Sequence, residues 1–244
     1  MADVLSLSSP QWQREVFPHT EPYPLTSDLW VVQGEFPKAT LPRNMIVYRF
    51  HDDQLLLHSV VAMNETAMLA LESLGRPAIM VIPHWDHWAH IVAFKQRYPD
   101  IDVVCPGKSK AKVELRLPVE HICEQYFPRH GMQFQTPAGM EPWEGVLELP
   151  LSTGKIALVM NDLITHVPHQ PGCYGKLLRL TGSTGRPRVI PPVRLNLKVK
   201  RHILKQYFQR LSRRDDIAVI TTSHGICITD QIQETLQAVA DDLG

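Results

Sequence analysis

The chain has 244 residues, of which 44% are hydrophobic and 20% charged, so it can bury a sizeable core and is not a disordered protein. Its 25 Lys and Arg residues balance its 25 Asp and Glu residues, and this zero net charge gives no electrostatic reason to expect nucleic acid or an anionic membrane as a partner. The 4 cysteines lack CxxC spacing, and we find neither a signal peptide nor an apolar run of about 18 residues. We therefore expect a cytoplasmic protein without a membrane span.

The length exceeds the usual single-domain size of about 150 residues, yet α/β folds of about 200 to 250 residues are often one domain. We expect a single domain over residues 1–244, with an extended N-terminal arm at about 1–27 that is rich in Pro, Ser and Thr. The longest basic stretch, at about 198–205, lies in a predicted amphipathic helix and is best explained as a solvated face.

Strand-like and helical patterns alternate along the first half of the chain. Two apolar runs on either side of a polar turn at 51–53 predict a β-hairpin. Five apolar residues at 78–82 predict a strand that is buried on both faces, and helical spacing begins at about Trp85. In chain order, this half predicts strands at 29–33, 44–50 and 54–60, a helix at 64–74, a strand at 78–82, a helix from about 85 to 97 and a strand at 101–105.

The second half predicts fewer strands and one long irregular segment. Residues 163–195 contain five prolines and little periodicity, which indicates a long loop with room for one short helix. Its Gly-Ser-Thr-Gly-Arg run lacks the spacing of a phosphate-binding loop. The remaining predictions are edge strands at 132–135 and 146–149, a strand at 155–160, a helix at 197–211, a strand at 217–222 and a helix at 229–243, with 107–130 unassigned.

Polar side chains gather where the buried strand at 78–82 ends. Imidazole nitrogens and carboxylate oxygens are ligands that zinc accepts, and four of them within seven positions can converge only at a sharp turn. The alternative is that these histidines cap the strand and bond to the backbone. The four residues are His84, Asp86, His87 and His90.

Two further polar points follow predicted strands. Asp162 comes after the strand at 155–160, and His224 comes after the strand at 217–222 and before Gly225. Catalytic groups of open sheets commonly lie at such strand ends. We therefore expect the three points to belong to one site.

These three points, in this order, resemble the metallo-β-lactamase superfamily, whose signature is an HxHxDH motif after a strand, a later His, a strand-end Asp and a final His before Gly. In this sequence, Ile82-Pro-His84-Trp-Asp86-His87 falls on the first motif, Asp162 on the bridging aspartate and His224 on the last histidine. The resemblance covers about residues 29–243. It implies an α+β fold, a metallo-β-lactamase-like αββα sandwich of two mixed sheets, with metal ions at one edge.

The sequence departs from the family pattern at the first metal site. Ile82 replaces the first His of the motif, and the His expected upstream of Asp162 is missing, with Met140, Glu141 and Glu144 in its neighbourhood. Two glycines that usually follow the motif are replaced by Ala89 and His90. The resemblance therefore implies a single metal ion held at the second site, with His84 or His90 completing or orienting it. The implied ligands of that site are Asp86, His87, Asp162 and His224.

Two hypotheses follow for function. The first is a mononuclear metal-dependent hydrolase of an unidentified small molecule, with zinc favoured, iron or manganese open, and Asp86 as the catalytic residue. Extra ligands or acid–base groups would be His90, His166 and His169. The second is a metal-free, non-catalytic relict of the fold that serves as a binding or structural module. The sequence leaves a homo-oligomer open.

Overall fold

The computed structural model describes residues 6, 9–36, 41–196 and 198–244. These residues divide into two compact units, Met1–Tyr126 and Phe127–Gly244, called unit 1 and unit 2 below. Each unit contains one β-sheet with its own buried core. The single domain predicted for the whole chain is not tested by this division and stays a prediction.

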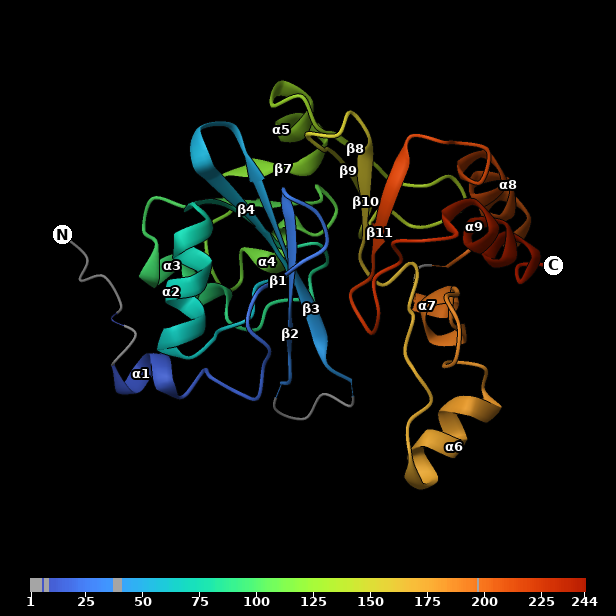
Figure 1. Cartoon of the computed structure of the whole chain (residues 1–244), viewed down its shortest axis with the longest axis horizontal. Helices are drawn as coiled ribbons and strands as arrows, with labels where there is room; N and C mark the ends of the chain where they lie inside the picture. The colour runs from blue at the N-terminus through green and yellow to red at the C-terminus, as the bar shows by residue number, and fades with distance from the viewer. Residues whose placement is uncertain (1–5, 7–8, 37–40, 197) are drawn as a thin grey trace. The chain divides into compact units, whose positions relative to one another are not determined.

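Unit 1 is built on a seven-stranded mixed sheet with its strands in chain order (Figure 1). The predicted hairpin is confirmed, since β3 and β4 pair antiparallel on either side of a short 3-10 turn, His51–Asp53. β5 then lies between β4 and β6 and is parallel to both, which explains why it is apolar and buried after its first residue, Arg76. The strands are β1 Tyr23–Pro24, β2 Leu29–Gly34, β3 Arg43–Phe50, β4 Gln54–His58, β5 Arg76–Val81, β6 Asp102–Cys105 and β7 His121–Ile122.

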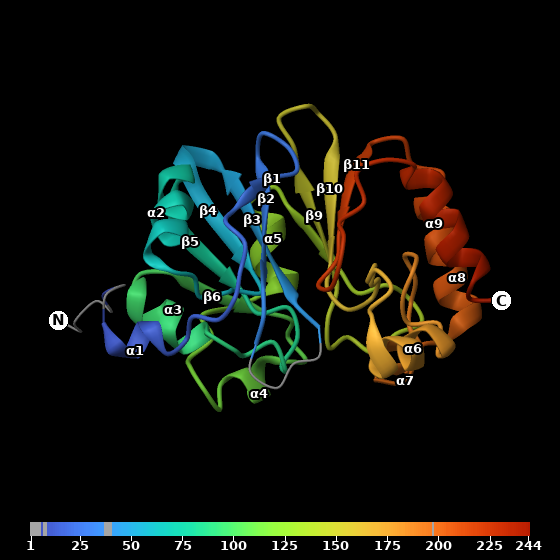
Figure 2. The same ribbon diagram turned by 60° about the horizontal axis from the view of Figure 1, so that its bottom comes forward.

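The described residues of unit 1 also form helices α1 to α5, and Figure 2 shows α2 and α3 along one side of its sheet. The helix predicted at 64–74 is confirmed as α2: Asn64 accepts a hydrogen bond from the Ala67 N–H at its start, and Gly75 follows its end. The N-terminal arm is not simply extended: Ser9 caps the turn α1, and the buried Trp12 donates its ring N–H to the Met63 carbonyl. The helices are α1 Pro10–Gln13, α2 Glu65–Leu74, α3 Ile91–Arg97, α4 Lys110–Val113 and α5 Cys123–Arg129, the last crossing into unit 2.

Unit 2 contains a four-stranded mixed sheet in the order β11-β10-β9-β8. β10 is parallel to β11 and antiparallel to β9, so the carboxyl ends of β10 and β11 meet at one edge of the sheet. α8 and α9 pack together beside this sheet (Figure 2). The elements are β8 Gln133–Gln135, β9 Val146–Pro150, β10 Ile156–Met160, α6 Gly172–Leu180, α7 Pro191–Asn196, α8 Arg201–Leu211, β11 Ile217–Thr221 and α9 Ile232–Asp241.

Four predictions need correction. The helix expected from Trp85 begins only at Ile91, because a turn occupies the intervening residues and His90 has a left-handed backbone. β9 is an interior strand and not an edge, since it pairs with both β8 and β10. The segment 163–195 contains two helices, α6 and α7. The helix predicted at 197–211 begins at Arg201, and Leu197 lies outside the described residues.

The prediction of an α+β fold with two mixed sheets is confirmed. Among the described residues, no helix combines the length and the apolar character that a bilayer crossing requires.

Candidate functional site

The loop that follows β5 carries the polar cluster of unit 1. Ile82 still donates its N–H to the Val104 carbonyl, so the sheet pairing continues one residue past β5 until Pro83, which has no N–H, ends it. The chain then turns tightly, and the His87 N–H donates to the His84 carbonyl at 3.0 Å. The turn keeps His84 and His87 buried while Asp86 stays partly exposed.

His84 and Asp86 form a pair through Nδ1 of the imidazole and Oδ1 of the carboxylate. The His84 ring is 1% exposed, whereas the Asp86 carboxylate is 43% exposed. Nε2 of His84 is buried and makes no hydrogen bond with any residue that the structure describes. A buried ring nitrogen without a partner costs free energy, and a cation or a ligand donor would satisfy it.

The ring of His87 is held through its Nδ1. Nδ1 of His87 lies 3.0 Å from the hydroxyl oxygen of Ser59, and both residues are buried. Ser59 follows β4 and has a left-handed backbone with φ 62°, a conformation that non-glycine residues adopt at a cost. The hydroxyl fixes the ring plane and directs Nε2 away from Ser59, as outer partners do for metal-binding histidines.

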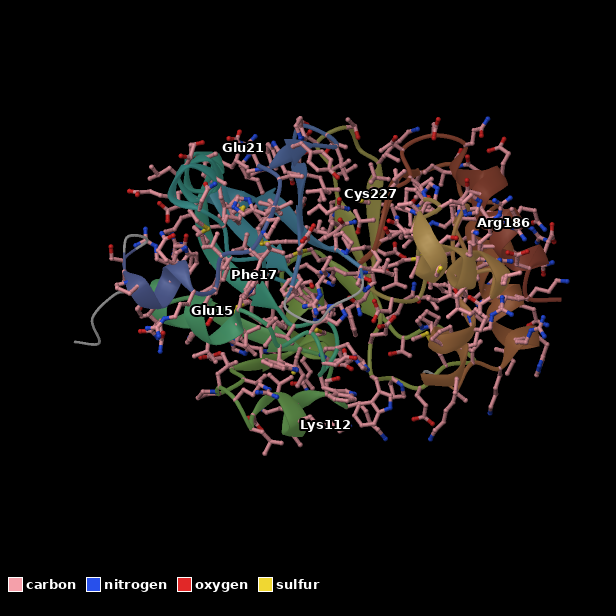
Figure 3. All side chains as sticks on the ribbon, turned by 90° about the horizontal axis from the view of Figure 1, so that it is seen from below. Glu15, Phe17, Glu21, Lys112, Arg186 and Cys227 are labelled. Atoms are coloured by element: carbon pink, nitrogen blue, oxygen red, sulfur yellow. The ribbon has the colours of Figure 1, made fainter. Side chains whose placement is uncertain are left out.

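His90 is held differently. Its Nδ1 accepts the Ala62 N–H at 2.9 Å, and its ring stacks on Phe36 at a centroid distance of 4.7 Å. Phe17 and Glu15, labelled in Figure 3, come from the N-terminal segment; Phe17 also stacks on the ring, and Glu15 Oε2 lies 4.0 Å from Nε2. Burial lowers the pKa of His90 to about 4, and the charge of Arg43 acts in the same direction. His90 is therefore a neutral core histidine, in agreement with the alternative that such residues bond to the backbone.

In unit 2, Asp162 and His224 lie together at the ends of the parallel strands β10 and β11. Nε2 of His224 is 3.5 Å from Oδ1 of Asp162, and the same oxygen accepts a hydrogen bond from the Ser223 hydroxyl. The two strand ends are joined by the Ser223 N–H, which donates to the Asn161 carbonyl at 3.2 Å. Both side chains of the pair are only about a fifth exposed, at 20% for Asp162 and 23% for His224.

His166 and His169 belong to the loop after β10, and each has partners in unit 2. Nδ1 of His166 lies 3.1 Å from the Ile226 carbonyl, and burial lowers the pKa of this histidine. Nδ1 of His169 is 3.0 Å from the Thr184 hydroxyl. His166 also contacts His224 through the backbone, because the His166 N–H donates to the His224 carbonyl at 3.1 Å.

The residues at or near the positions of the missing first-site ligands are buried. Ile82 is fully buried in the core of unit 1 and offers no ligand atom. Glu144 is 1% exposed and accepts a hydrogen bond from the Asn161 amide at 2.8 Å. The sequence did not predict that Ser59 and Ser223 contact the site residues. The signal it offered is their position, because Ser59 directly follows β4 and Ser223 lies two residues after β11.

Comparison with known proteins identifies the fold. No family model and no curated protein matches the sequence. Solved structures do match: the FIM-1 metallo-β-lactamase from Pseudomonas aeruginosa in its mono-zinc form superposes with a TM-score of 0.60 at 14% identity over 93% of this chain and 97% of that one. The chain has the metallo-β-lactamase fold.

Two other structures with the metallo-β-lactamase fold give the same result. DIM-1, in a crystal exposed to ceftazidime, has a TM-score of 0.62 at 12% identity and covers 93% of this chain and 99% of its own. A metallo-β-lactamase from Hirschia baltica has a TM-score of 0.59 at 12% identity, covering 90% and 97%. Identities this low establish the fold and leave activity to be inferred from the side chains of this chain.

Proposed function

We propose that this protein is a mononuclear metal-dependent hydrolase of a small molecule, with zinc as the favoured ion and Asp86, His87, Asp162 and His224 as its ligands. The observation that carries the proposal is that His87, Asp86 and Asp162 each have an outer partner: Ser59 for His87, His84 for Asp86 and Ser223 for Asp162. Such partners fix the ligand orientation and are typical of metal sites.

The donor set fits one ion better than two. Two imidazoles and two carboxylates satisfy the four-coordinate preference of zinc. Of the residues that would hold a first ion in the family, only His84 remains, because Ile82 is aliphatic and buried in the core. The mono-zinc form of FIM-1 shows that a relative in fold can hold a single ion.

We assign different roles in the proposed hydrolysis to Asp86 and His84. A bound divalent ion supplies Lewis acidity and brings the pKa of water toward about 7. Asp86 keeps one carboxylate oxygen on His84, and its exposure of 43% lets it reach a reacting water as a proton acceptor. His84, through its Nδ1 contact, holds that carboxylate in place, so we assign it a positioning role.

The alternative is a metal-free module that keeps the fold without the chemistry. Ile82 favours it, because a buried aliphatic side chain closes the position where the family has a ligand. In that case His224 and Asp162 would form a simple ion pair, and the His87–Ser59 contact would be structural.

Metal content separates the two hypotheses. After reconstitution with zinc, iron or manganese, we expect one equivalent in the parent protein and none in His87→Ala, together with loss of any hydrolysis found in a panel of β-lactam, thioester and phosphodiester substrates. His202→Ala removes an exposed histidine of α8 and serves as the matched control, which should keep one equivalent. No metal in the parent after reconstitution would contradict the proposal and favour the metal-free module. One equivalent retained by His87→Ala would show that the ligands are other residues.

A further inference from the structure

The zero net charge of the chain conceals a strong separation of charge along the sequence. Between Leu163 and Arg214 lie twelve of the 25 Lys and Arg residues and none of the 25 Asp and Glu residues. This segment covers α6, α7, α8 and the loops between them, all in unit 2. A basic segment of this kind indicates an anionic partner, which the balanced total does not reveal.

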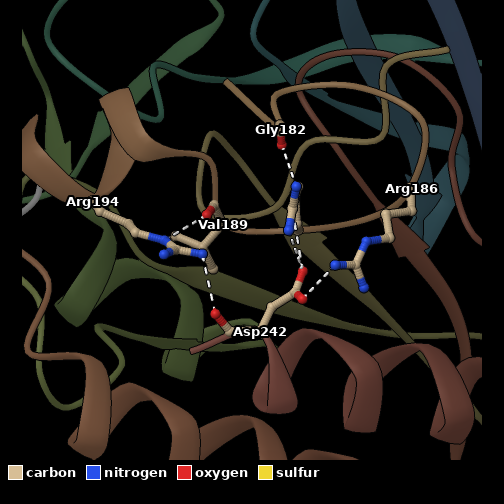
Figure 4. A network of polar contacts seen from close by, with 6 residues as sticks. Gly182, Arg186, Val189, Arg194 and Asp242 are labelled. Atoms are coloured by element: carbon tan, nitrogen blue, oxygen red, sulfur yellow. Dashed lines mark hydrogen bonds and ion pairs between the residues drawn. The ribbon is translucent and has the colours of Figure 1, made fainter. Parts of the chain in front are cut away.

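Carboxylates from elsewhere in unit 2 neutralise only a part of this charge. Figure 4 shows a network of such contacts around Asp242. Its carboxylate is shared by Arg186 and Arg188, and a guanidinium nitrogen of Arg194 donates to its backbone carbonyl at 3.4 Å. Two guanidinium groups thus share one carboxylate, a third meets the backbone carbonyl of the same residue, and Arg186 is still 53% exposed. Within the described residues, Lys176 and Arg179 on α6 make no ion pair.

α6 also exposes an apolar stripe beside these cations. Cys173, Leu177 and Leu180 follow the helical spacing i, i+4, i+7 and share one face. Leu177 is 56% exposed and Leu180 is 86% exposed, and Leu195 on α7 is 82% exposed. Figures 1 and 2 both show α6 and α7 on one side of unit 2, away from α9.

The opposite face of α6 is attached to its own loop. A side chain added at Gly175 would place its Cβ 1.8 Å from the Gln170 carbonyl oxygen, so the helix backbone packs closely against this segment. Because Gly175 lies on the side away from Leu177 and Leu180, the helix is held with its leucines outward. Exposed leucines flanked by Lys and Arg are the arrangement of helices that lie on a membrane surface.

We infer that α6 and the basic segment around it bind peripherally to a bilayer with anionic headgroups. Leu177 and Leu180 enter the boundary between headgroups and acyl chains, while Lys176, Arg179 and Arg186 contact the phosphates. Nucleic acid would use the cations and leave the leucines in water. This inference is independent of the proposed metal chemistry and revises the expectation that the zero net charge gave.

Vesicle co-sedimentation of the full chain tests the inference. We expect binding to vesicles of phosphatidylcholine mixed with phosphatidylglycerol, weaker binding at high salt, and none to phosphatidylcholine alone. Lys176→Gln with Arg179→Gln should lower partitioning about 30-fold, from about 1 kcal/mol for each cation. Leu177→Ser with Leu180→Ser should lower it roughly a hundredfold.

Matched controls come from outside the segment. Leu115→Ser removes a leucine that is 84% exposed in unit 1, and Arg129→Gln with Lys155→Gln removes two exposed cations. Both should bind as the parent does. Equal losses in the controls, equal binding to neutral vesicles, or no binding to either kind of vesicle would overturn the inference.

Two further measurements identify other occupants. Binding to a single-stranded oligonucleotide that depends on Lys176 and Arg179 but not on the leucines, without vesicle binding, would assign the surface to nucleic acid. A concentration-dependent dimer in sedimentation velocity that Leu177→Ser with Leu180→Ser abolishes, without vesicle binding, would assign it to a second copy of the chain. Either result overturns the membrane inference.

Discussion

Ser59 combines two properties at the scale of a single residue: a buried hydroxyl on the His87 ring and a left-handed backbone. A glycine would adopt φ 62° at no steric cost, whereas serine pays about 1 kcal/mol for it. The contact of the hydroxyl with the His87 ring is the interaction that would offset this backbone strain. Ser59 is therefore the residue at which the structural and the functional demands on this loop can be separated.

Two substitutions of Ser59 make that separation measurable. Ser59→Ala and Ser59→Gly both remove the hydroxyl, so both should lower metal affinity by about tenfold to a hundredfold in a competition titration with a chromophoric chelator. Ser59→Gly should be more stable than Ser59→Ala by about 1 kcal/mol in urea unfolding, because it relieves the backbone strain. Parent-like affinity in Ser59→Ala would show that the hydroxyl does not orient His87.

His90 makes stability depend on pH. Its folded-state pKa is about 4, below the value of 6.5 that it has when unfolded, because burial and the charge of Arg43 disfavour the imidazolium, while Glu15 faces the ring only at 4.0 Å. Above about pH 6.5 the histidine is neutral in both states and costs nothing. As the pH falls from 6.5 toward 4, His90 is protonated in the unfolded chain but stays neutral in the folded chain. The free energy of unfolding therefore decreases.

The substitution His90→Asn should remove this dependence. Asparagine accepts a left-handed backbone and keeps an acceptor for the Ala62 N–H, but it does not titrate. The free energy of unfolding of the parent should drop relative to that of the variant by about 3 kcal/mol between pH 7 and 4. Urea unfolding across this range measures the difference. Parallel pH profiles for the two proteins would contradict the assignment of a neutral buried histidine.

At the scale of elements, the loops after β10 and β11 are joined through their backbones. The Ile226 N–H donates to the His166 carbonyl at 2.9 Å, and Gly225 forms a bridge with His166. Gly225 has φ +87°, and a Cβ there would lie 2.0 Å from the His166 carbonyl oxygen. Glycine is therefore required beside His224 for two reasons, conformation and space.

Gly225→Ala should separate the two loops. We expect a loss of about 3 kcal/mol in stability, from strain and overpacking together, and a clear loss of bound metal as His224 moves. Gly154→Ala is the matched control, because Gly154 has a similar φ of +79° but nothing within 4 Å of the added Cβ. The control should lose only about 1 kcal/mol and keep its metal. Equal effects of both substitutions would mean that the contact with His166 does not position His224.

At the scale of the whole molecule, a metal ion that binds only the folded chain adds to its stability. The added free energy is RT ln(1 + [L]/Kd), about 2.7 kcal/mol at a hundredfold excess of ion over Kd. Melting of the metal-loaded parent should therefore shift downward on addition of a chelator, and readdition of zinc should restore it. The His87→Ala variant should melt at the same temperature with and without chelator. A chelator-insensitive melting curve for a parent shown to contain metal would place that metal outside the folded site.

Local patterns in the sequence were enough to predict the order and type of most elements. Alternating and continuous apolar runs predicted β2 to β6, and the helix predicted at 64–74 differs from α2 by one residue at its start. The resemblance of three strand-end motifs predicted the metallo-β-lactamase fold that the solved structures confirm. It also named the proposed ligands, whose role stays a prediction.

The groups that those side chains contact could not be predicted from local patterns. His87 meets Ser59 and His90 meets the Ala62 N–H, each across 28 positions in the sequence, because β4 and β5 pair in parallel and bring their ends together. No local pattern encodes such a contact, since it depends on strand order and register. The same pairing makes His90, a candidate ligand by spacing alone, a core histidine whose Nδ1 is used by the backbone.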